Sequence, residues 1–370
     1  MKYALLVLTL PIAAQAQRSL PDTSVTVTFG GFVDGYYAWD FGRPASFDRS
    51  FAGGTTFTTQ PARHNEFNIN LAFVEATLDG ARVRGRLALQ AGTSVQSNYA
   101  GEPTTGSVSG PTLARHIQEA YAGAKLGDNV WVDGGIFYSH MGMESWASRD
   151  NPTYTRSLVS EYSPYYSSGV KIDWAATPKL TAQLDVVNGW QNISENNSGK
   201  GAGIRLDLAA SPTTTVSYYN FFSDEAGNRL RTFNGIGAKV ASGRMTLIGQ
   251  FDLGTQGKSS DDSGSASWYG FTTIARAQVT PTVALSGRVE RYDDKDQVII
   301  TTGSQRDGAP NAPFRANGGS VGLDVAPQAR LLWRTELRGF SNTAAIFPNG
   351  TTGAPRKADA FVVSSLAVTF

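Results

Sequence analysis

Three arginines recur at every second position in one short segment of the sequence. Arg82, Arg84 and Arg86 alternate with small or apolar residues, among them Val83 and Leu87. In an extended strand, successive side chains point to opposite faces, so the three guanidinium groups would share one face. Like charges this close repel one another unless something they bind offsets the cost. The chemistry this pattern predicts is electrostatic, namely a field that orders water and screens solutes.

The same alternation places many more charged residues on the polar faces of extended segments. We interpret them as the lining of a water-filled lumen in which the arginine ladder is opposed by carboxylates, so that a transverse field screens solutes by size and charge. The alternative is that they are only the polar half of amphipathic strands. Besides the ladder, the set comprises Asp173, Asp185, Arg205, Asp207, Asp252, Arg288, Glu290, Arg334, Glu336 and Arg338.

The elements that must position these residues are strands of about ten residues. Segments 82–92, 179–186, 201–208, 245–253 and 283–292 sort apolar and polar side chains onto opposite faces, as the period of two in a strand requires. Extending this pattern predicts sixteen strands at 24–40, 66–79, 82–92, 115–126, 130–139, 165–175, 179–190, 201–210, 214–223, 231–240, 244–254, 267–279, 282–292, 317–326, 329–340 and 358–370.

The connections between these strands alternate between short and long. Seven are tight and rich in turn-forming residues, such as 80–81, 177–178 and 280–281, whereas 41–65 and 93–114 are long and polar. An outer-membrane barrel distributes its periplasmic turns and extracellular loops in this way. We therefore predict an all-β fold, a transmembrane antiparallel β-barrel with both chain ends on one side.

Composition agrees with this fold and excludes other classes. Charged residues make up 17% of the chain, yet no stretch after the N-terminus has the roughly twenty consecutive apolar residues that a membrane-spanning helix needs. The net charge of +1 and the absence of a basic cluster argue against a nucleic-acid partner. The chain has no cysteine, which removes a disulfide-stapled module from consideration.

The two ends of the chain carry export and assembly signals. Lys2, a short apolar stretch and Ala14-Gln15-Ala16 predict a signal peptide over 1–16, which leaves 17–370 as a single barrel domain. The last segment, 360–370, alternates apolar residues and ends in Phe370. This ending is similar to the signal that outer-membrane proteins present to the barrel assembly machinery. We expect the mature protein in the bacterial outer membrane, in contact with its lipid and lipopolysaccharide.

Two further groups of residues complete the predicted site. The third long connection, 140–164, is a candidate for folding inward as a constriction, with a surface loop as the alternative. Aromatic residues near strand ends predict the two interfacial girdles of a membrane barrel. The constriction candidates are Glu144, Arg149, Asp150, Arg156 and Glu161, and the girdle candidates are Trp39, Trp174, Trp190, Trp268, Trp333 and Phe370.

Nothing in the sequence indicates an enzyme. Its three histidines, His64, His116 and His140, lie at or near loop ends and belong to no recognisable nucleophile motif. No phosphate-binding loop and no metal-ligand spacing is present. We therefore expect no catalytic residue, cofactor or metal.

Several segments resemble one family of barrels. Residues 30–37 (GGFVDGYY), 65–76 (NEFNINLAFVEA) and 117–124 (IQEAYAGA), with Gly134-Gly135-Ile136-Phe137 and Ser168-Gly169-Val170, are similar to the β-barrel porin-2 family, which is OmpL-like. The likeness is densest between residues 30 and 225. It implies an outer-membrane barrel and carries over no catalytic residues.

These observations leave alternative functions. The first hypothesis is a porin, a passive diffusion channel for small hydrophilic solutes or ions, for which a homotrimer is a plausible assembly. The second is a structural or adhesive barrel with a blocked lumen and partner-binding loops. An outer-membrane hydrolase and a secreted β-sandwich are the remaining alternatives, and a continuous apolar belt around the outside would exclude the sandwich.

Overall fold

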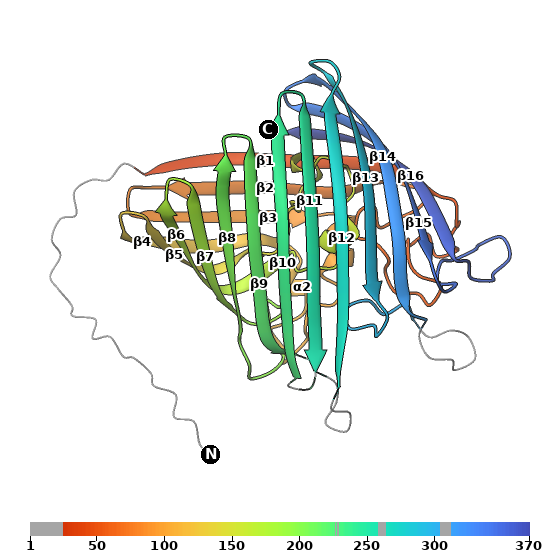
Figure 1. Cartoon of the computed structure of the whole chain (residues 1–370), viewed down its shortest axis with the longest axis horizontal. Helices are drawn as coiled ribbons and strands as arrows, with labels where there is room; N and C mark the ends of the chain where they lie inside the picture. The colour runs from red at the N-terminus through yellow and green to blue at the C-terminus, as the bar shows by residue number, and fades with distance from the viewer. Residues whose placement is uncertain (1–24, 226, 228, 258–263, 304–311) are drawn as a thin grey trace.

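The computed structural model describes residues 25–225, 227, 229–257, 264–303 and 312–370. Its strands form one closed antiparallel barrel, in which each strand pairs with the next along the chain and β16 closes against β1 (Figure 1). The predicted fold class and all sixteen predicted strands are confirmed. The predicted signal peptide, 1–16, lies outside the described residues.

Strand boundaries agree with the prediction to within a few residues. The strands are β1 (Thr26–Asp40), β2 (Phe67–Asp79), β3 (Val83–Ala91), β4 (Ile117–Gly127), β5 (Val130–Tyr138), β6 (Tyr166–Thr177), β7 (Leu180–Val187), β8 (Gly201–Ser211), β9 (Thr214–Glu225), β10 (Arg229–Ser242), β11 (Met245–Gly257), β12 (Ser265–Gln278), β13 (Val283–Asp294), β14 (Phe314–Gln328), β15 (Leu331–Asn342) and β16 (Ala358–Thr369).

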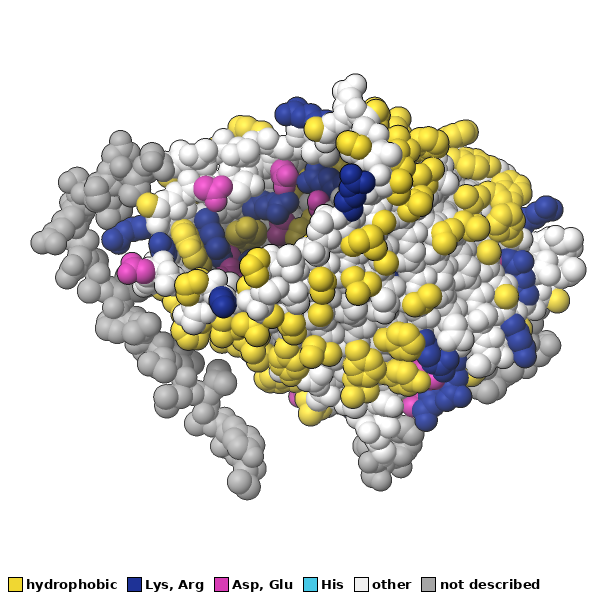
Figure 2. Space-filling view, turned by 45° about the horizontal axis from the view of Figure 1, so that its top comes forward, with side chains coloured by type: hydrophobic (Ala, Val, Ile, Leu, Met, Phe, Trp, Pro, Cys, Tyr) yellow, Lys and Arg dark blue, Asp and Glu magenta, His cyan; other side chains and the backbone are white. Residues whose placement is uncertain are grey.

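The alternating pattern sorts apolar residues to the outside of the barrel. In β3, Val83, Leu87 and Leu89 are exposed, whereas Ala88 and Gln90 between and beyond them are buried in the interior. Apolar side chains spread over the outer wall in Figure 2. Because an outward face of this kind gains nothing from contact with water, the wall is suited to lipid.

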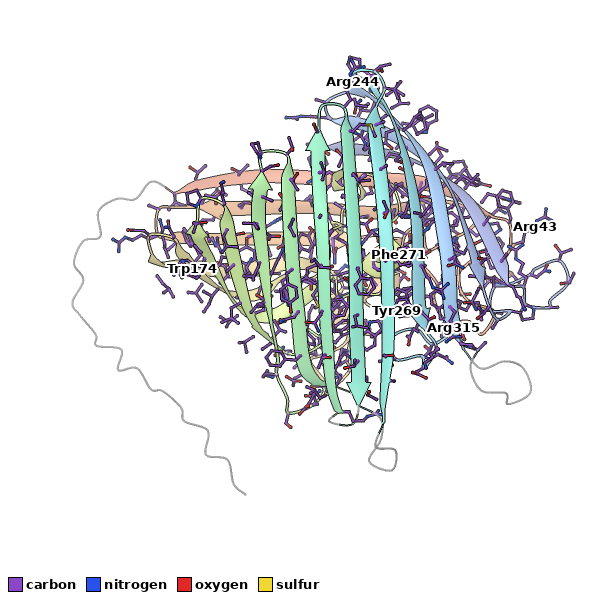
Figure 3. All side chains as sticks on the ribbon, viewed as in Figure 1. Arg43, Trp174, Arg244, Tyr269, Phe271 and Arg315 are labelled. Atoms are coloured by element: carbon purple, nitrogen blue, oxygen red, sulfur yellow. The ribbon has the colours of Figure 1, made fainter. Side chains whose placement is uncertain are left out.

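Short turns lie at one end of the barrel and long loops at the other (Figure 1). The turn after β2, for example, occupies residues 80–82, whereas the connection after β1 runs from 41 to 66. Figure 3 shows Arg244 at the tip of a short turn and Arg43 and Arg315 towards the loop end. We refer to these as the turn end and the loop end.

In the part of the chain that the structure describes, the long loops contain four short helices and pack inside the barrel. They are α1 (Thr93–Asn98), α2 (Pro111–Ala114), the 3-10 helix η1 (Ser148–Asp150) and α3 (Leu158–Glu161). None of the described helices is long and apolar enough to cross a membrane. The connection 139–165, which carries η1 and α3, contributes buried residues to two apolar clusters, Leu158 and Val159 to one and Trp146 to the other.

As a result, the interior differs between the two ends. Interior side chains in the loop-end half are buried, such as Asp40 in β1, Val187 in β7 and Phe340 in β15. Interior side chains in the turn-end half of β3 to β8 keep contact with solvent, among them Arg84 and Asp207. Figure 2 shows the resulting hollow at the turn end, with basic and acidic side chains inside it.

Candidate functional site: the charged lumen and its inward loop

The connection 139–165, called the inward loop below, is held on the wall formed by β13 to β15. Arg288 donates to the Thr153 hydroxyl at 3.0 Å and to the Thr155 carbonyl at 2.6 Å. Arg334 donates to the carbonyl oxygens of Asn151 and Pro152, both at 3.1 Å. These guanidinium groups satisfy loop carbonyls that would otherwise be buried without a partner, which fixes the loop in place.

Carboxylates of the same wall complete this anchor. Glu290 accepts from the Leu158 amide at 2.6 Å and from Arg338 at 2.8 Å. Glu336 accepts from the Thr155 amide at 2.7 Å and from Arg288 at 2.9 Å. All four charged side chains are at most 1% exposed. Buried charges require such pairing, because an unpaired one would cost several kcal/mol.

Here the structure corrects the predicted lining. Arg288, Glu290, Arg334, Glu336 and Arg338 do point inward, but the inward loop covers them. They therefore anchor the loop instead of facing open water. The alternation along a strand predicts which face a side chain points to, but it does not predict whether another part of the chain covers that face.

The loop is also tied to the opposite side of the barrel. Ser148 donates to the Asp34 carboxylate of β1 at 3.0 Å, and the Trp146 indole donates to Gln90 of β3 at 2.9 Å. At its start, His140 places Nδ1 2.6 Å from Asp185 of β7. With anchors on β1, β3, β7, β13 and β15, the loop is a fixed partition across the interior.

Asp185 and Asp252, also predicted to line the lumen, are likewise buried. Asp185 pairs with His140, and Asp252 accepts from the Tyr219 hydroxyl at 2.7 Å and from Gln250 at 2.8 Å. Both point inward as predicted, but loop packing removes them from solvent. Asp185 therefore belongs with the anchors of the inward loop, and Asp252 with the buried interior packing.

The five constriction candidates lie inside the barrel, where most of them shape the loop itself. Glu144 accepts from the Ser157 amide and hydroxyl. Arg156 stacks on Tyr165 and donates to the Ser160 carbonyl, while Glu161 accepts from the amide of Thr59 and from Tyr165. Arg149 and Asp150 are only partly covered and face the turn-end space.

The open wall carries the remaining predicted charges. Arg84 pairs with Asp133 of β5 and Asp173 of β6, and Arg86 pairs with Glu75 of β2 and, at 2.8 Å, with Glu119 of β4. Lys171 lies 3.4 Å from Asp133. Side chains of this wall such as Arg84, Arg86 and Asp173 retain about a quarter to a third of their exposure.

These ion pairs explain how Arg84 and Arg86 can lie on one face without strong mutual repulsion. They also correct the predicted position of the opposing carboxylates. The carboxylates that offset the repulsion between Arg84 and Arg86 belong to the same wall, on β5 and β6 for Arg84 and on β2 and β4 for Arg86. They are not ranged across the lumen, so the predicted opposition of the ladder by facing carboxylates is wrong. Arg82 is also not part of the ladder, because β3 begins at Val83 and Arg82 is exposed in the turn before it.

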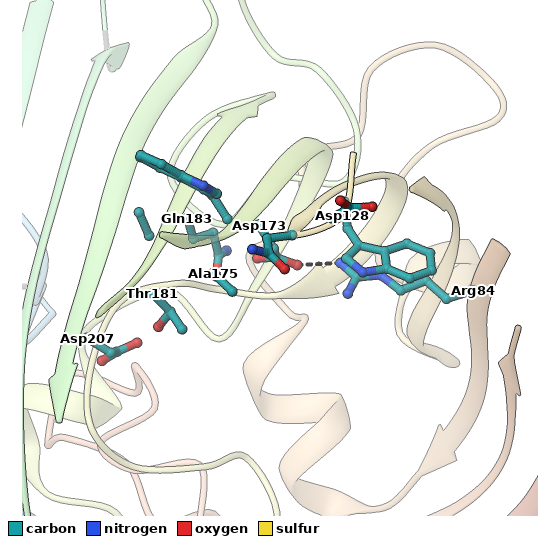
Figure 4. Close-up of a pocket in the computed structure, with 11 residues that line it drawn as sticks. Arg84, Asp128, Asp173, Ala175, Thr181, Gln183 and Asp207 are labelled. Atoms are coloured by element: carbon teal, nitrogen blue, oxygen red, sulfur yellow. Dashed lines mark hydrogen bonds and ion pairs between the residues drawn. The ribbon is translucent and has the colours of Figure 1, made fainter. Parts of the chain in front are cut away.

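A cavity of about 490 Å³ opens beside Arg84 at the turn end of this wall. Figure 4 shows Arg84, Asp173, Gln183 and Asp207 around it, with the ion pair between Arg84 and Asp173 marked. Asp207 pairs in turn with Arg205 at 2.8 Å. Arg84, Asp173 and Asp207 at this entrance are thus each engaged in an ion pair.

The aromatic candidates divide into two groups. Trp39, Trp174 and Trp333 occupy outward-facing positions near strand ends, and Phe370 is exposed at the turn end; Figure 3 shows Trp174 at the edge of the barrel. Their role in a girdle stays a prediction. The other two candidates, Trp190 and Trp268, lie in the interior instead.

Trp190 and Trp268 are therefore corrections. Trp268 is fully buried, packs near Trp190 with ring centroids 6.1 Å apart, and occupies space beside Gly254 that any larger side chain would fill. The sequence does hold the signal, since Trp268 alternates with the outward residues Tyr269 and Phe271. Proximity to a strand end alone was misleading.

Sequence reasoning missed several interior charges. Glu75, Glu119, Asp133 and Lys171 all pair with or flank the arginine ladder. Each lies on the inward face of its strand, so strict application of the alternation would have found them. Among the described residues, no group of three His, Cys, Asp or Glu side chains is arranged to hold a metal ion.

One carboxylate in the loops, that of Glu102, has a raised pKa. Glu102, in the loop between β3 and β4, accepts from the Tyr166 hydroxyl of β6. It also accepts from the amides of Ile193 and Ser194 in the loop between β7 and β8, so it joins both loops to β6. Burial raises the pKa of Glu102 above its ordinary value, although these hydrogen bonds act in the opposite direction. The folded loops therefore bind this proton more tightly than the unfolded chain does.

Comparison with solved structures shows the same fold. The chain is similar to an anion-selective porin from Comamonas acidovorans (12% identity, 94% of this chain and 100% of that chain, TM-score 0.60). It is also similar to Salmonella typhi OmpF in complex with daunomycin (12%, 93% and 97%, 0.61) and to a trimer form of Vibrio cholerae OmpT (8%, 94% and 100%, 0.57). No curated protein matches the sequence significantly.

The comparison with family models identifies the chain. The model described as "Putative beta-barrel porin-2, OmpL-like" matches residues 26–370, which is the whole barrel. This confirms the resemblance seen in the sequence and agrees with the barrel closure and the charged interior. The chain belongs to this family of outer-membrane porins.

Proposed function

We propose that this porin is a passive diffusion channel for small hydrophilic solutes, and that solutes pass between the inward loop and the wall formed by β3 to β8. The observation that supports this route is the uneven exposure of interior charges. Arg84, Arg86 and Asp207 keep contact with solvent, whereas Arg288 and Arg338 on the other wall are fully covered.

The proposed mechanism has no chemical step. The inward loop limits solute size, because its anchors on several strands keep it from moving aside. The paired charges of the open wall supply hydrogen-bonding groups that replace part of a solute's hydration shell. Since these charges balance one another locally, they hold polar solutes weakly enough to release them, as conduction requires.

Cysteine substitution tests the route, because the chain has no cysteine of its own. Asp173→Cys and Gln183→Cys place a thiol on the open wall, and Thr272→Cys places one on the interior wall where residues are buried. Planar-bilayer conductance is recorded before and after a charged methanethiosulfonate reagent. We expect stepwise conductance that the reagent reduces in the first two variants and leaves unchanged in the third.

The opposite results would reject the proposal in different ways. Block only in Thr272→Cys would place the route along the other wall. A correctly folded barrel that shows no conductance would exclude the diffusion channel and favour a blocked barrel whose loops bind partners. Circular dichroism and heat-modifiable electrophoretic mobility establish folding in each case.

The remaining expectations concern export and assembly. We infer that residues 1–16 direct export as a signal peptide and that β16, which ends beside the exposed Phe370, is read by the barrel assembly machinery. We also infer a homotrimer in a membrane that contains lipopolysaccharide. The trimer form of the similar OmpT structure supports this assembly.

A further inference from the structure

A second interior cavity lies at the turn end, beneath the inward loop and on the far side from the open wall. Its volume is about 290 Å³, enough for about ten water molecules at roughly 30 Å³ each. The side chains that matter come from four elements and the loop. They are Arg149, Asp150, Lys239 of β10, Arg276 of β12, Asp324 of β14 and Arg334 of β15.

The pairing inside this cavity leaves positive charge uncompensated. Asp324 receives both Arg334, at 2.8 Å, and Arg276, at 3.3 Å. One carboxylate thus serves two guanidinium groups. Asp150 lies 3.7 Å from Arg149 and is itself half exposed. Lys239 has no ion pair or hydrogen bond with any residue that the structure describes, and it is exposed to the cavity.

The N–H groups of these cations differ in how many hydrogen bonds they already make. Those of Arg334 are bonded to Asp324 and to carbonyl oxygens of the inward loop. Arg276 contacts Asp324 and Gln278 through Nε and Nη1 only. Arg149 lies over the rings of Phe32 and Phe73 at 5.1 and 5.2 Å, which orients its guanidinium group. Lys239, Arg276 and Arg149 therefore retain N–H groups for a ligand.

We propose that this cavity binds a small oxyanion, inorganic phosphate or a short carboxylate. Both ligands offer the oxygen atoms that guanidinium and ammonium groups bind with charge-assisted hydrogen bonds. The cavity also faces the lumen, so that a solute reaches it without crossing the wall. The contrast with the Arg84 entrance is direct, because the cations there are all paired with carboxylates. As a step in permeation, this site rests on the proposed function, but anion binding itself does not.

Binding is measured by calorimetry on the refolded full barrel in detergent micelles, with inorganic phosphate and succinate as separate probes. We expect saturable binding of at least one probe. Lys239→Ala/Arg276→Ala should weaken it at least about tenfold, because two charged hydrogen-bond donors are lost. Lys239→Arg keeps the charge and should retain binding, and the preferred probe shows whether phosphate or carboxylate is the natural class.

A matched control removes the same charge from the same end of the barrel. Arg244→Ala/Arg330→Ala deletes two exposed arginines in short turns outside the cavity and should leave binding unchanged. An equal loss of binding in both double variants would mean that the anion is attracted by the overall positive charge of this end, which would overturn the proposed site. The absence of binding to the wild-type barrel would overturn it as well. Conductance is recorded in parallel, so that failure of the channel and failure of the anion site are distinguished.

Discussion

At the scale of single residues, interior charges divide into buried anchors and exposed lining. Glu290 is an anchor, because it neutralises Arg338 and lies 3.3 Å from Arg288 while accepting from the Leu158 amide. Glu290→Leu should lower the free energy of unfolding by about 3–5 kcal/mol, since it leaves buried cations without their carboxylate. Urea unfolding in detergent, followed by tryptophan fluorescence, measures this loss.

The control for this prediction is an ion pair near the surface. Glu66 pairs with Arg63 at 2.9 Å at the loop end, with both side chains partly exposed. Glu66→Leu should change the free energy of unfolding by less than about 1 kcal/mol. Similar losses in the two variants would contradict the division into anchors and lining.

Residue positions could be predicted from the sequence more completely than residue roles. Alternation correctly places Arg84, Arg288 and Glu336 on inward faces. Whether such a residue meets water or another part of the chain depends on where the long loops fold, which no periodicity records. Trp268 shows a different error, because its alternation with Tyr269 and Phe271 places it inside even though it lies near a strand end.

At the scale of elements, strands were predictable and loop packing was not. Each strand is specified locally, by its own alternation and by the turn residues that bound it. The inward loop is instead fixed by side chains far away in sequence, such as Asp34 and Arg334. Its short helices η1 and α3 have too few residues for a periodic signal.

Loop packing at Glu102 predicts a dependence on pH. Because burial raises the pKa of Glu102 above its ordinary value of 4.5, its contribution to stability is fully present below that value and is lost as the pH rises through the higher folded pKa. Glu102→Gln keeps a hydrogen-bond acceptor without the titration. Relative to the wild type, this variant should therefore gain stability between acidic and neutral pH.

Comparing the two proteins by urea unfolding at a series of pH values isolates this effect, since all other groups are shared. Limited proteolysis of the loops at the same pH values reports local opening. A stability difference between the variant and the wild type that stays constant with pH would contradict the assignment to Glu102.

At the scale of the whole molecule, the outward apolar faces of the strands should behave as one lipid-facing surface. Val289 lies at the middle of β13, points outward and is 62% exposed. Val289→Arg should cost about 2–4 kcal/mol of unfolding free energy in phospholipid vesicles, because the charge sits near the bilayer midplane. Val108→Arg, in an exposed loop, should change it by less than about 0.5 kcal/mol. Equal effects of the two changes would mean that the middle of β13 does not face lipid.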